Sequence, residues 1–444
     1  MIHLDNQIRV FPCPDGQLQR VQAVTLPNWE DLAFLRPEPS GDGFASFCNI
    51  YRRYLVPACP WIFGRILLFR LPEGISVPGS PAIADPLTRA AIVLKKGIRH
   101  SGSRVCFRTP EAEVLYRQLE QQDCVQTVCG KLPITTIIPV SDRAGYLTQA
   151  APDARMKVNG SFFIMDPVDC ATVYDHVGTP IGLQVKNGTV ENPPLYDREA
   201  LLVDRTGTVS VRPVKLTDLR IRIGSTDYIP GENARLYTRP ERAKTPGGNG
   251  IRLVITGCHV AAVHTGGRVP IPASGFVLCP DVPCAAKPGD VVRYLGLENI
   301  SFGIQVGNSI LRDGVKTQRF LSRFYNIRKL EPVPFPPSLY TMDFKHARAA
   351  RIALGADKDG RPMVLWAEGA AKLGHDPTRD SRGASLMDMA EFCQRMGMHH
   401  AIHLDGGGSA QLLVENRRSL KISDRQDASG TEAERPVPLG LQFP

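Results

Sequence analysis

The segment His403-Leu404-Asp405-Gly406-Gly407-Gly408-Ser409 has the composition of a functional site, because one carboxylate stands beside three residues without side chains. Consecutive glycines let a backbone approach a ligand closely, at an entropic cost that an ordinary loop has little reason to bear. Their amides can donate hydrogen bonds to an oxyanion or a phosphate. We expect the segment to form a hairpin between two strands.

The surroundings of these glycines argue against a nucleotide-binding loop. They follow a strand and precede another strand, Ala410–Val414, whereas phosphate-binding glycine loops open a helix. His399, His400 and His403 lie close in sequence, but alternation along a strand places 400 and 403 on opposite faces. We therefore predict neither a metal ion nor another cofactor.

Asn159-Gly160-Ser161 forms a polar group at the end of an apolar strand and is followed by Phe162-Phe163. Asn-Gly pairs are most often turns. Alternatively, the aromatic pair continues the strand, and the amide of Asn159 points into a cleft where it can hold a sugar hydroxyl.

Arg351 stands among apolar residues in the predicted buried strand Ala350–Gly355. An unpaired buried cation is expensive, so this guanidinium must meet a carboxylate, a phosphate or solvent. Its planar set of donors suits a phosphate. A structural salt bridge is an equally good interpretation.

Glu368 follows the strand Met363–Ala367, which forms a hairpin with the strand of Arg351. A carboxylate at such a strand end can act as acid, base or nucleophile. The alternative is an exposed glutamate before a glycine turn.

The remaining pattern predicts an α+β fold that is rich in strands and has few helices. A helix is expected from Ser385, with Asp388 completing a capping box, to Gly397. Asn187-Gly188 and Asp359-Gly360 predict hairpin turns. Strands are expected at Thr135–Val140, Ile181–Val185, Leu201–Val203, Leu219–Ile223 and Gly250–Thr256.

We expect two parts in the chain of 444 residues: a smaller N-terminal region of unknown fold at 1–125 and a strand-rich domain at 126–444. In the first part, the apolar run Trp61–Leu71 indicates a strand and Pro110 begins a helix. The prolines at 332, 334, 336 and 337 indicate an extended connection.

Composition bounds the environment and the partners. The net charge is +9, but the basic residues are dispersed, which excludes a nucleic-acid channel and leaves an anionic small molecule or glycan as the expected partner. No signal peptide or membrane-spanning segment is visible, and a cytoplasmic location is expected.

The eleven cysteines contain no Cys-x-x-Cys pair. Cys124 with Cys129, and Cys279 with Cys284, are either disulfides or buried thiols.

Taken in order, several blocks resemble the phosphodiester glycosidase family over the second two-thirds of the chain. The segment Leu404–Ser409 carries most weight. The other similar blocks are 159–163, 180–182, 271–277, 287–292, 308–314, 350–355, 385–397 and 434–437.

The resemblance implies hydrolysis of a sugar-1-phosphodiester at the glycosidic bond, releasing free sugar and a phosphate monoester. The sugar can be of the N-acetylglucosamine type, or the substrate can be a nucleotide-sugar. Its catalytic groups would be Asp405, Glu368 and Arg351. The substrate-binding residues would be Asn159, Gly160, Ser161, His403, Gly406, Gly407, Gly408 and Ser409.

The chain departs from the family pattern at the presumed site. Glu368-Gly369-Ala370 stands where Asp-Gly-Arg is usual, His403 where asparagine is usual, and Ser161 where glycine is common. The reaction type therefore carries over better than the substrate. Two alternatives stay open: a binding protein for glycans or phosphosugars without catalysis, and a phosphoesterase that acts at phosphorus.

Overall fold

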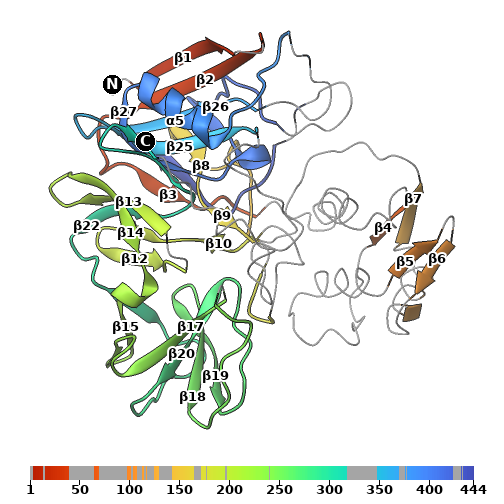
Figure 1. The fold of residues 1–444 in the computed structure, drawn as a ribbon, viewed down its shortest axis with the longest axis vertical. Coiled ribbons are helices and arrows are strands. Elements are labelled where there is room, and N and C mark those ends of the chain that lie inside the picture. The colour runs from red at the N-terminus through yellow and green to blue at the C-terminus, as the bar shows by residue number, and fades with distance from the viewer. Residues whose placement is uncertain are drawn as a thin grey trace.

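In the computed structural model, the largest sheet of the described residues is antiparallel and has seven strands; we call it the central sheet, and it lies in the upper part of Figure 1. The structure describes residues 4–13, 16–39, 143–164, 172–176, 178–195, 198–239, 241–317, 348–369, 376, 378–423, 432 and 434–444, the strands 65–69, 98–101, 104–107 and 125–129, and residues 113, 114 and 117. In spatial order the sheet consists of β1 (Asp5–Pro12), β2 (Leu18–Thr25), β26 (Pro362–Ala367), β25 (Arg351–Asp357), β27 (Met398–His403), β23 (Ser309–Arg312) and β24 (Val315–Lys316).

The middle strands β25 and β26 are buried along their whole length. Their alternate residues serve two cores, as the twofold period of a strand requires. Ala353 and Leu365 pack on one face with helix α5 (Leu386–Arg395), whereas Ile352 and Trp366 pack on the other. Continuous apolar runs in the sequence are the expected sign of strands covered on both faces.

A second sheet supplies the layer on the face away from α5. Val158, Leu412 and Leu441 of this sheet share one apolar cluster with Ile352 and Trp366 of the central sheet. Its strands, in spatial order, are β28 (Leu412–Val414), β8 (Met156–Asn159), β29 (Gly440–Phe443) and β3 (Ala33–Leu35).

The middle of the chain forms three further antiparallel sheets (Figure 1). The first contains β12 (Thr189–Asn192), β11 (Gln184–Lys186), β22 (Ile300–Ile304), β13 (Arg198–Asp204) and β14 (Val209–Val214). The second contains β16 (Thr226–Tyr228), β15 (Arg220–Ile223) and β21 (Val292–Leu295). The third contains β17 (Ala234–Thr238), β20 (Gly275–Pro280), β18 (Ile251–Thr256) and β19 (His259–Thr265).

Three strand pairs complete the described structure. They are β9 (Phe162–Phe163) with β10 (Pro180–Ile181), β4 (Arg65–Phe69) with β7 (Val125–Cys129), and β5 (Ile98–Ser101) with β6 (Arg104–Phe107). The prediction of a strand-rich fold is therefore confirmed. No helix in the described part of the chain has the length and apolar character needed to cross a membrane.

The first strands of the chain belong to the sheets of its C-terminal part. β2 pairs with β26, and β3 pairs with β29. These pairings join sequence segments more than 300 residues apart, a relation that local periodicity does not reveal. The proposed boundary near residue 125 stays a prediction, while β1, β2 and β3 belong to the two sheets of the C-terminal part.

Helix α5 follows its sequence signals closely. Ser385 is its N-cap, and the side chains of Ser385 and Asp388 form the predicted capping box. Gly397 has φ +90° just beyond the C-cap residue Met396, the left-handed conformation that glycine adopts most easily. The predicted inward face is confirmed, because Leu386, Met389, Ala390, Cys393 and Met396 are buried.

The turns and strands of the middle region were largely predictable. Asn187 and Gly188 have φ +51° and +80°, as a type I′ hairpin requires. The strands expected near 201, 219 and 250 exist, and β4 lies within the apolar run 61–71. The strand expected at 181–185 is interrupted, because Gly182, with φ +102°, separates β10 from β11.

Four sequence predictions lie largely or wholly outside the described residues: the strand at 135–140, the helix after Pro110, the connection at 332–337 and the Cys124–Cys129 pair.

For the second cysteine pair, Cys279 and Cys284, the prediction of thiols is confirmed, since both residues are free. Cys279 is buried, and the Tyr228 hydroxyl donates to Cys284 Sγ at 3.3 Å.

We predict that Ser385→Ala lowers the free energy of unfolding by about 1 kcal/mol, because the Asp388 amide loses its side-chain acceptor at 3.1 Å. Chemical denaturation of the purified protein measures the change. Ser385→Thr is the control and should retain most of the stability, since threonine also caps helices. Equal losses in the two variants would contradict the capping role.

Candidate active site

The register of the central sheet brings Arg351, Glu368 and Asp405 to the same end of three neighbouring strands. Arg351 pairs with Ala367, the residue before Glu368. On the other side, the Leu404 amide donates to the Ile352 carbonyl at 2.9 Å, which places Asp405 beside the start of β25. The prediction that these three residues share one region follows directly from this pairing.

The segment around Asp405 is not the hairpin that the sequence suggested. β27 ends at His403 in the central sheet, whereas β28 begins at Leu412 and pairs with β8 in the second sheet. Between them lies a short 3-10 turn, Gly407–Ser409. The prediction was wrong because the glycines carry the chain from one layer to the next, and nothing in a local pattern distinguishes a crossing from a return.

Asn159 anchors this crossing. Its Nδ2 donates to the Asp405 carbonyl at 2.8 Å, and its Oδ1 accepts from the Gln411 amide at 3.0 Å. The Asp405 amide donates to the Gly160 carbonyl at 3.0 Å. Both ends of the amide side chain therefore hold backbone, so the structure gives Asn159 a supporting position beneath Asp405. Ser161 is also buried, and its Oγ has no hydrogen-bond partner among the described residues.

Asp405, Gly406 and Gly407 are the partly exposed members of the predicted site, while Gly408 and Ser409 are buried. Loss of hydration raises the pKa of Asp405 to about 6. Four groups oppose this rise: the Ser409 hydroxyl, the Arg435 guanidinium, the Gly406 amide at 2.9 Å and the Arg351 guanidinium. A carboxyl group with this pKa changes charge close to physiological pH.

Two of the three glycine amides donate hydrogen bonds within the protein. The Gly406 amide donates to Asp405 Oδ1, and the Gly407 amide donates to the Ala350 carbonyl at 2.8 Å. A Cβ placed on Gly406 would lie 2.8 Å from the Ala350 carbonyl oxygen, so the two segments meet too closely for any side chain. Gly407 has φ +63° and open space where a Cβ would stand.

Three buried guanidinium groups act on the segment that holds His403 and Asp405. Arg351 donates from Nε to the Ala384 carbonyl at 3.1 Å, just before α5. Arg435 donates to Ser409 Oγ at 3.3 Å, and Arg198 donates to the Val306 carbonyl and lies 5.8 Å from the centre of the Phe162 ring. The charges of Arg351 and Arg435 act on Asp405, and those of Arg351 and Arg198 act on His403, so this region favours an anion.

His403 is fully buried at the end of β27. Burial, together with the charges of Arg351 and Arg198, holds the pKa of its imidazole well below the usual range. The ring is therefore neutral at physiological pH. Its amide donates to the Asn308 carbonyl at 2.9 Å, and its carbonyl accepts from Gly307 at 2.8 Å, so backbone contacts fix its position.

Glu368 is buried and accepts several hydrogen bonds. Its Oε2 accepts from Arg20 Nη1 at 3.1 Å and from the Ser381 hydroxyl, and its Oε1 accepts from the Lys421 amide at 2.8 Å. The interpretation as an exposed glutamate is wrong, because 3% of the residue is accessible. These contacts join β2, the segment before α5 and the segment after β28.

Sequence reasoning missed Arg20, Arg198 and Arg435. Arg435 lies within a block that contributed to the family resemblance, so its position offered a signal. Arg20 and Arg198 stand in ordinary strand sequence. The pairing of β2 with β26 brings Arg20 to Glu368. Arg198 begins β13, which pairs with β22, and its charge acts on His403.

Similarity to curated proteins is confined to a short segment. N-acetylglucosamine-1-phosphodiester alpha-N-acetylglucosaminidase of mouse is 33% identical over 81 residues, which is 18% of this chain and 14% of that protein. The human protein of the same name gives the same values. The chain thus matches about one-seventh of the length of these relatives.

Solved structures give low overall similarity. A hypothetical protein from Synechocystis has a TM-score of 0.45 at 14% identity, covering 99% of this chain and 61% of that one. The catalytic domain of zebrafish N-acetylglucosamine-1-phosphodiester alpha-N-acetylglucosaminidase has a TM-score of 0.41 at 11% identity, covering 100% and 83%.

The phosphodiester glycosidase family model matches residues 262–443. This range includes Arg351, Glu368, Asp405 and Arg435, but neither Asn159 nor Arg198. The resemblance predicted from the sequence is confirmed at the level of the family: residues 262–443 of this chain are similar to the phosphodiester glycosidases.

Proposed function

We propose that this chain hydrolyses the glycosidic bond of a sugar-1-phosphodiester and releases free sugar and a phosphate monoester. The observation that carries the proposal is Asp405, a partly exposed carboxylate with a raised pKa, beside three buried arginines: Arg351 and Arg435 act on Asp405 itself, and Arg198 acts on His403, two residues before it. Two of these arginines, Arg351 and Arg435, lie within the residues matched by the family model. An anionic sugar derivative suits such a site.

The guanidinium groups serve the phosphate. A phosphodiester carries one negative charge, and its departure as a monoester adds negative charge to the leaving oxygen. Arg351 stabilises this charge, and Arg435 and Arg198 add to the positive potential. Because these side chains are fixed by carbonyl and hydroxyl acceptors, they need little rearrangement when charge develops.

Asp405 acts at the sugar carbon of the glycosidic bond. In its ionised form it stabilises the oxocarbenium-like centre or attacks it, as carboxylates do in glycoside hydrolysis. A phosphate monoester is a good leaving group and needs little protonation, so the carboxylate is the more useful form of Asp405. The neutral ring of His403 adds no charge that would compete with it.

Glu368 is proposed to position the site. Both of its oxygens already accept hydrogen bonds, and its burial separates it from solvent. A carboxylate held in this way orients the end of β26 next to Arg351. The assignment of Glu368 as a catalytic group stays a prediction. The variant Glu368→Gln, described below, distinguishes a catalytic role from a positioning role.

Product analysis tests the reaction class. Wild-type protein incubated with a panel of sugar-1-phosphodiesters, including nucleotide-sugars, should yield free sugar and phosphate monoester by NMR and mass spectrometry. Asp405→Asn should lower turnover by about 10²-fold or more, the scale of one positioned carboxylate. Sugar phosphate as product would show cleavage at phosphorus, and binding without turnover would show a binding protein. Wild-type rates in Asp405→Asn would remove Asp405 from the mechanism.

Asp405→Asn should also stabilise the fold at neutral pH. The folded pKa of about 6 lies above the ordinary value of 3.8 for an aspartate, so the folded state holds the proton more tightly. This favourable contribution is present below the unfolded pKa and is lost as pH rises through about 6. Removing the charge should therefore increase stability by about 1–2 kcal/mol at pH 7.5, after allowance for partial exposure.

Denaturant titrations of both proteins at pH 7.5 and pH 4 measure this difference. The gain should shrink toward zero at pH 4, where the wild-type carboxyl is mostly protonated when folded. A gain independent of pH would mean that the charge of Asp405 is not its cause.

Glu368→Gln should cost about 2–3 kcal/mol of stability, because it leaves Arg20 without its buried carboxylate partner. Turnover at a temperature where the variant is folded should fall less than about tenfold, below the usual contribution of a catalytic acid or base. Glu415→Gln is the matched control: its ion pair with Arg155 is largely exposed and should cost below about 1 kcal/mol. A folded Glu368→Gln protein without turnover would restore Glu368 as a catalytic group.

A further inference from the structure

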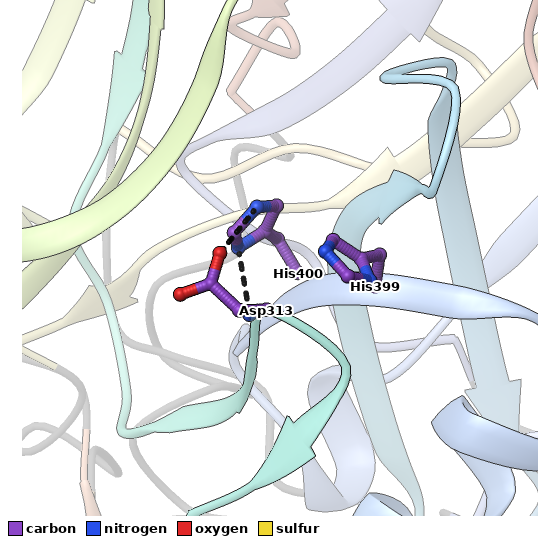
Figure 2. A group of neighbouring side chains, drawn as sticks. All are labelled: Asp313, His399 and His400. Carbon is purple, nitrogen blue, oxygen red and sulfur yellow. Dashed lines mark hydrogen bonds and ion pairs between the residues drawn. The ribbon is translucent and has the colours of Figure 1, made fainter.

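Asp313, His399 and His400 form a compact group of potential metal ligands at the edge of the central sheet (Figure 2). One donor atom from each residue lies within 4.8 Å of the other two. The group comes from two separate segments, the β23–β24 hairpin and the first half of β27. It takes no part in the function proposed above.

A bulge in β27 explains how adjacent histidines come to share one side. In the pairing with β25, His400 is opposite Ala356 and Met398 is opposite Asp357, which leaves His399 as an extra residue. Such a bulge turns neighbouring side chains away from strict alternation. The two imidazole rings are 5.0 Å apart between centroids and nearly perpendicular, at 84°.

The third residue is presented by a tight turn. Arg312 pairs with Val315, and the two residues between them, Asp313 and Gly314, have φ +51° and +71°, as in a type I′ turn. The Gly314 amide donates to the His399 carbonyl at 2.8 Å, and Gln394 Nε2 donates to the Gly314 carbonyl at 3.0 Å. The turn is therefore attached to both β27 and α5.

The distances suit a small divalent ion. Zinc binds nitrogen and carboxylate oxygen at about 2.0–2.2 Å, which separates two tetrahedral ligand atoms by roughly 3.3–3.6 Å. His400 Nε2 and Asp313 Oδ1 are 3.6 Å apart. The His399 donor atom lies within 4.8 Å of the other two, and rotation of its side chain would let it approach the ion.

The hydrogen bonding of His400 permits this use. Its Nδ1 accepts from the Asp313 amide at 3.4 Å, a long and therefore weak bond. Metal binding at Nε2 moves the ring proton to Nδ1 and gives up only this contact. The Asp313 amide lies in an exposed turn, where water can replace the lost acceptor.

The local charges also permit a cation. Arg312 immediately precedes Asp313 in the β23–β24 hairpin. Arg312 is paired with Glu199, which reduces its repulsion of an ion. Asp313 supplies the negative charge, and its side chain is 74% exposed, so water can reach an open coordination position.

We propose that Asp313, His399 and His400 bind a divalent transition-metal ion that prefers imidazole ligands, such as zinc. Two histidines and one carboxylate match the ligand types that zinc favours. The ion fastens the β23–β24 hairpin to β27. Because β27 ends next to Asp405, this contact stabilises the strand that carries the candidate active site.

Zinc titration of the chelator-treated full chain tests the proposal. Calorimetry should show one zinc ion bound per chain at this site, and thermal denaturation should show a higher midpoint with zinc. His399→Gln, His400→Gln and Asp313→Asn should each weaken binding at least about tenfold, the minimum effect seen when groups around a metal are lost. Asparagine is chosen at 313 because it tolerates the left-handed conformation of this turn.

Two control variants separate this site from zinc bound elsewhere, for example by cysteines. His259→Gln changes an exposed histidine of β19, and Asp359→Asn changes an exposed aspartate that also precedes a glycine in a hairpin loop. Both should bind zinc as wild type does. No binding by wild type, or equal binding by wild type and the three ligand variants, would overturn the proposal.

Discussion

The pairing of β25 with β26 on one side and β27 on the other is the constraint on which the rest of the structure depends. Both faces of β25 are covered, so each of its residues has one permitted environment. A shift of register by one residue would turn every side chain of β25 to the opposite face of the sheet. Arg351 would then enter the apolar core that holds Ile352, and Ile352 would take the place of a residue that packs against α5. The same register fixes Glu368 and Asp405 relative to Arg351.

Burial of charge is the second organising feature. Arg351 and Arg198 donate to backbone carbonyls and Arg435 to a serine hydroxyl, which lowers the cost of removing these cations from water. The charges of Arg351 and Arg435 also favour ionisation of Asp405, which burial opposes. The result of these opposing effects is a pKa of about 6 for Asp405. The charged form of this residue therefore lowers the stability of the folded protein at neutral pH, at a position where a reactive carboxylate would be useful.

The sequence predicted local features well and long-range features poorly. The cap at Ser385, the turn at Asn187 and the burial of β25 follow from patterns within a few residues, and the structure contains them. The pairing of β2 with β26 and of β3 with β29 depends on complementary surfaces far apart in the chain. For the same reason Arg351, Glu368 and Asp405 could be named from the sequence, whereas Arg20 and Arg198 could not.

The glycines after Asp405 have structural reasons that the sequence did not reveal. They were singled out as amide donors for a ligand, yet Gly406 is required because the Ala350 carbonyl oxygen would be only 2.8 Å from a Cβ at this position. Gly407 is required by its positive φ, which turns the chain toward the second sheet. The bulge at His399 is a comparable case, since strict alternation would separate it from His400. In both places one irregular backbone step, rather than the side chains alone, determines which groups meet.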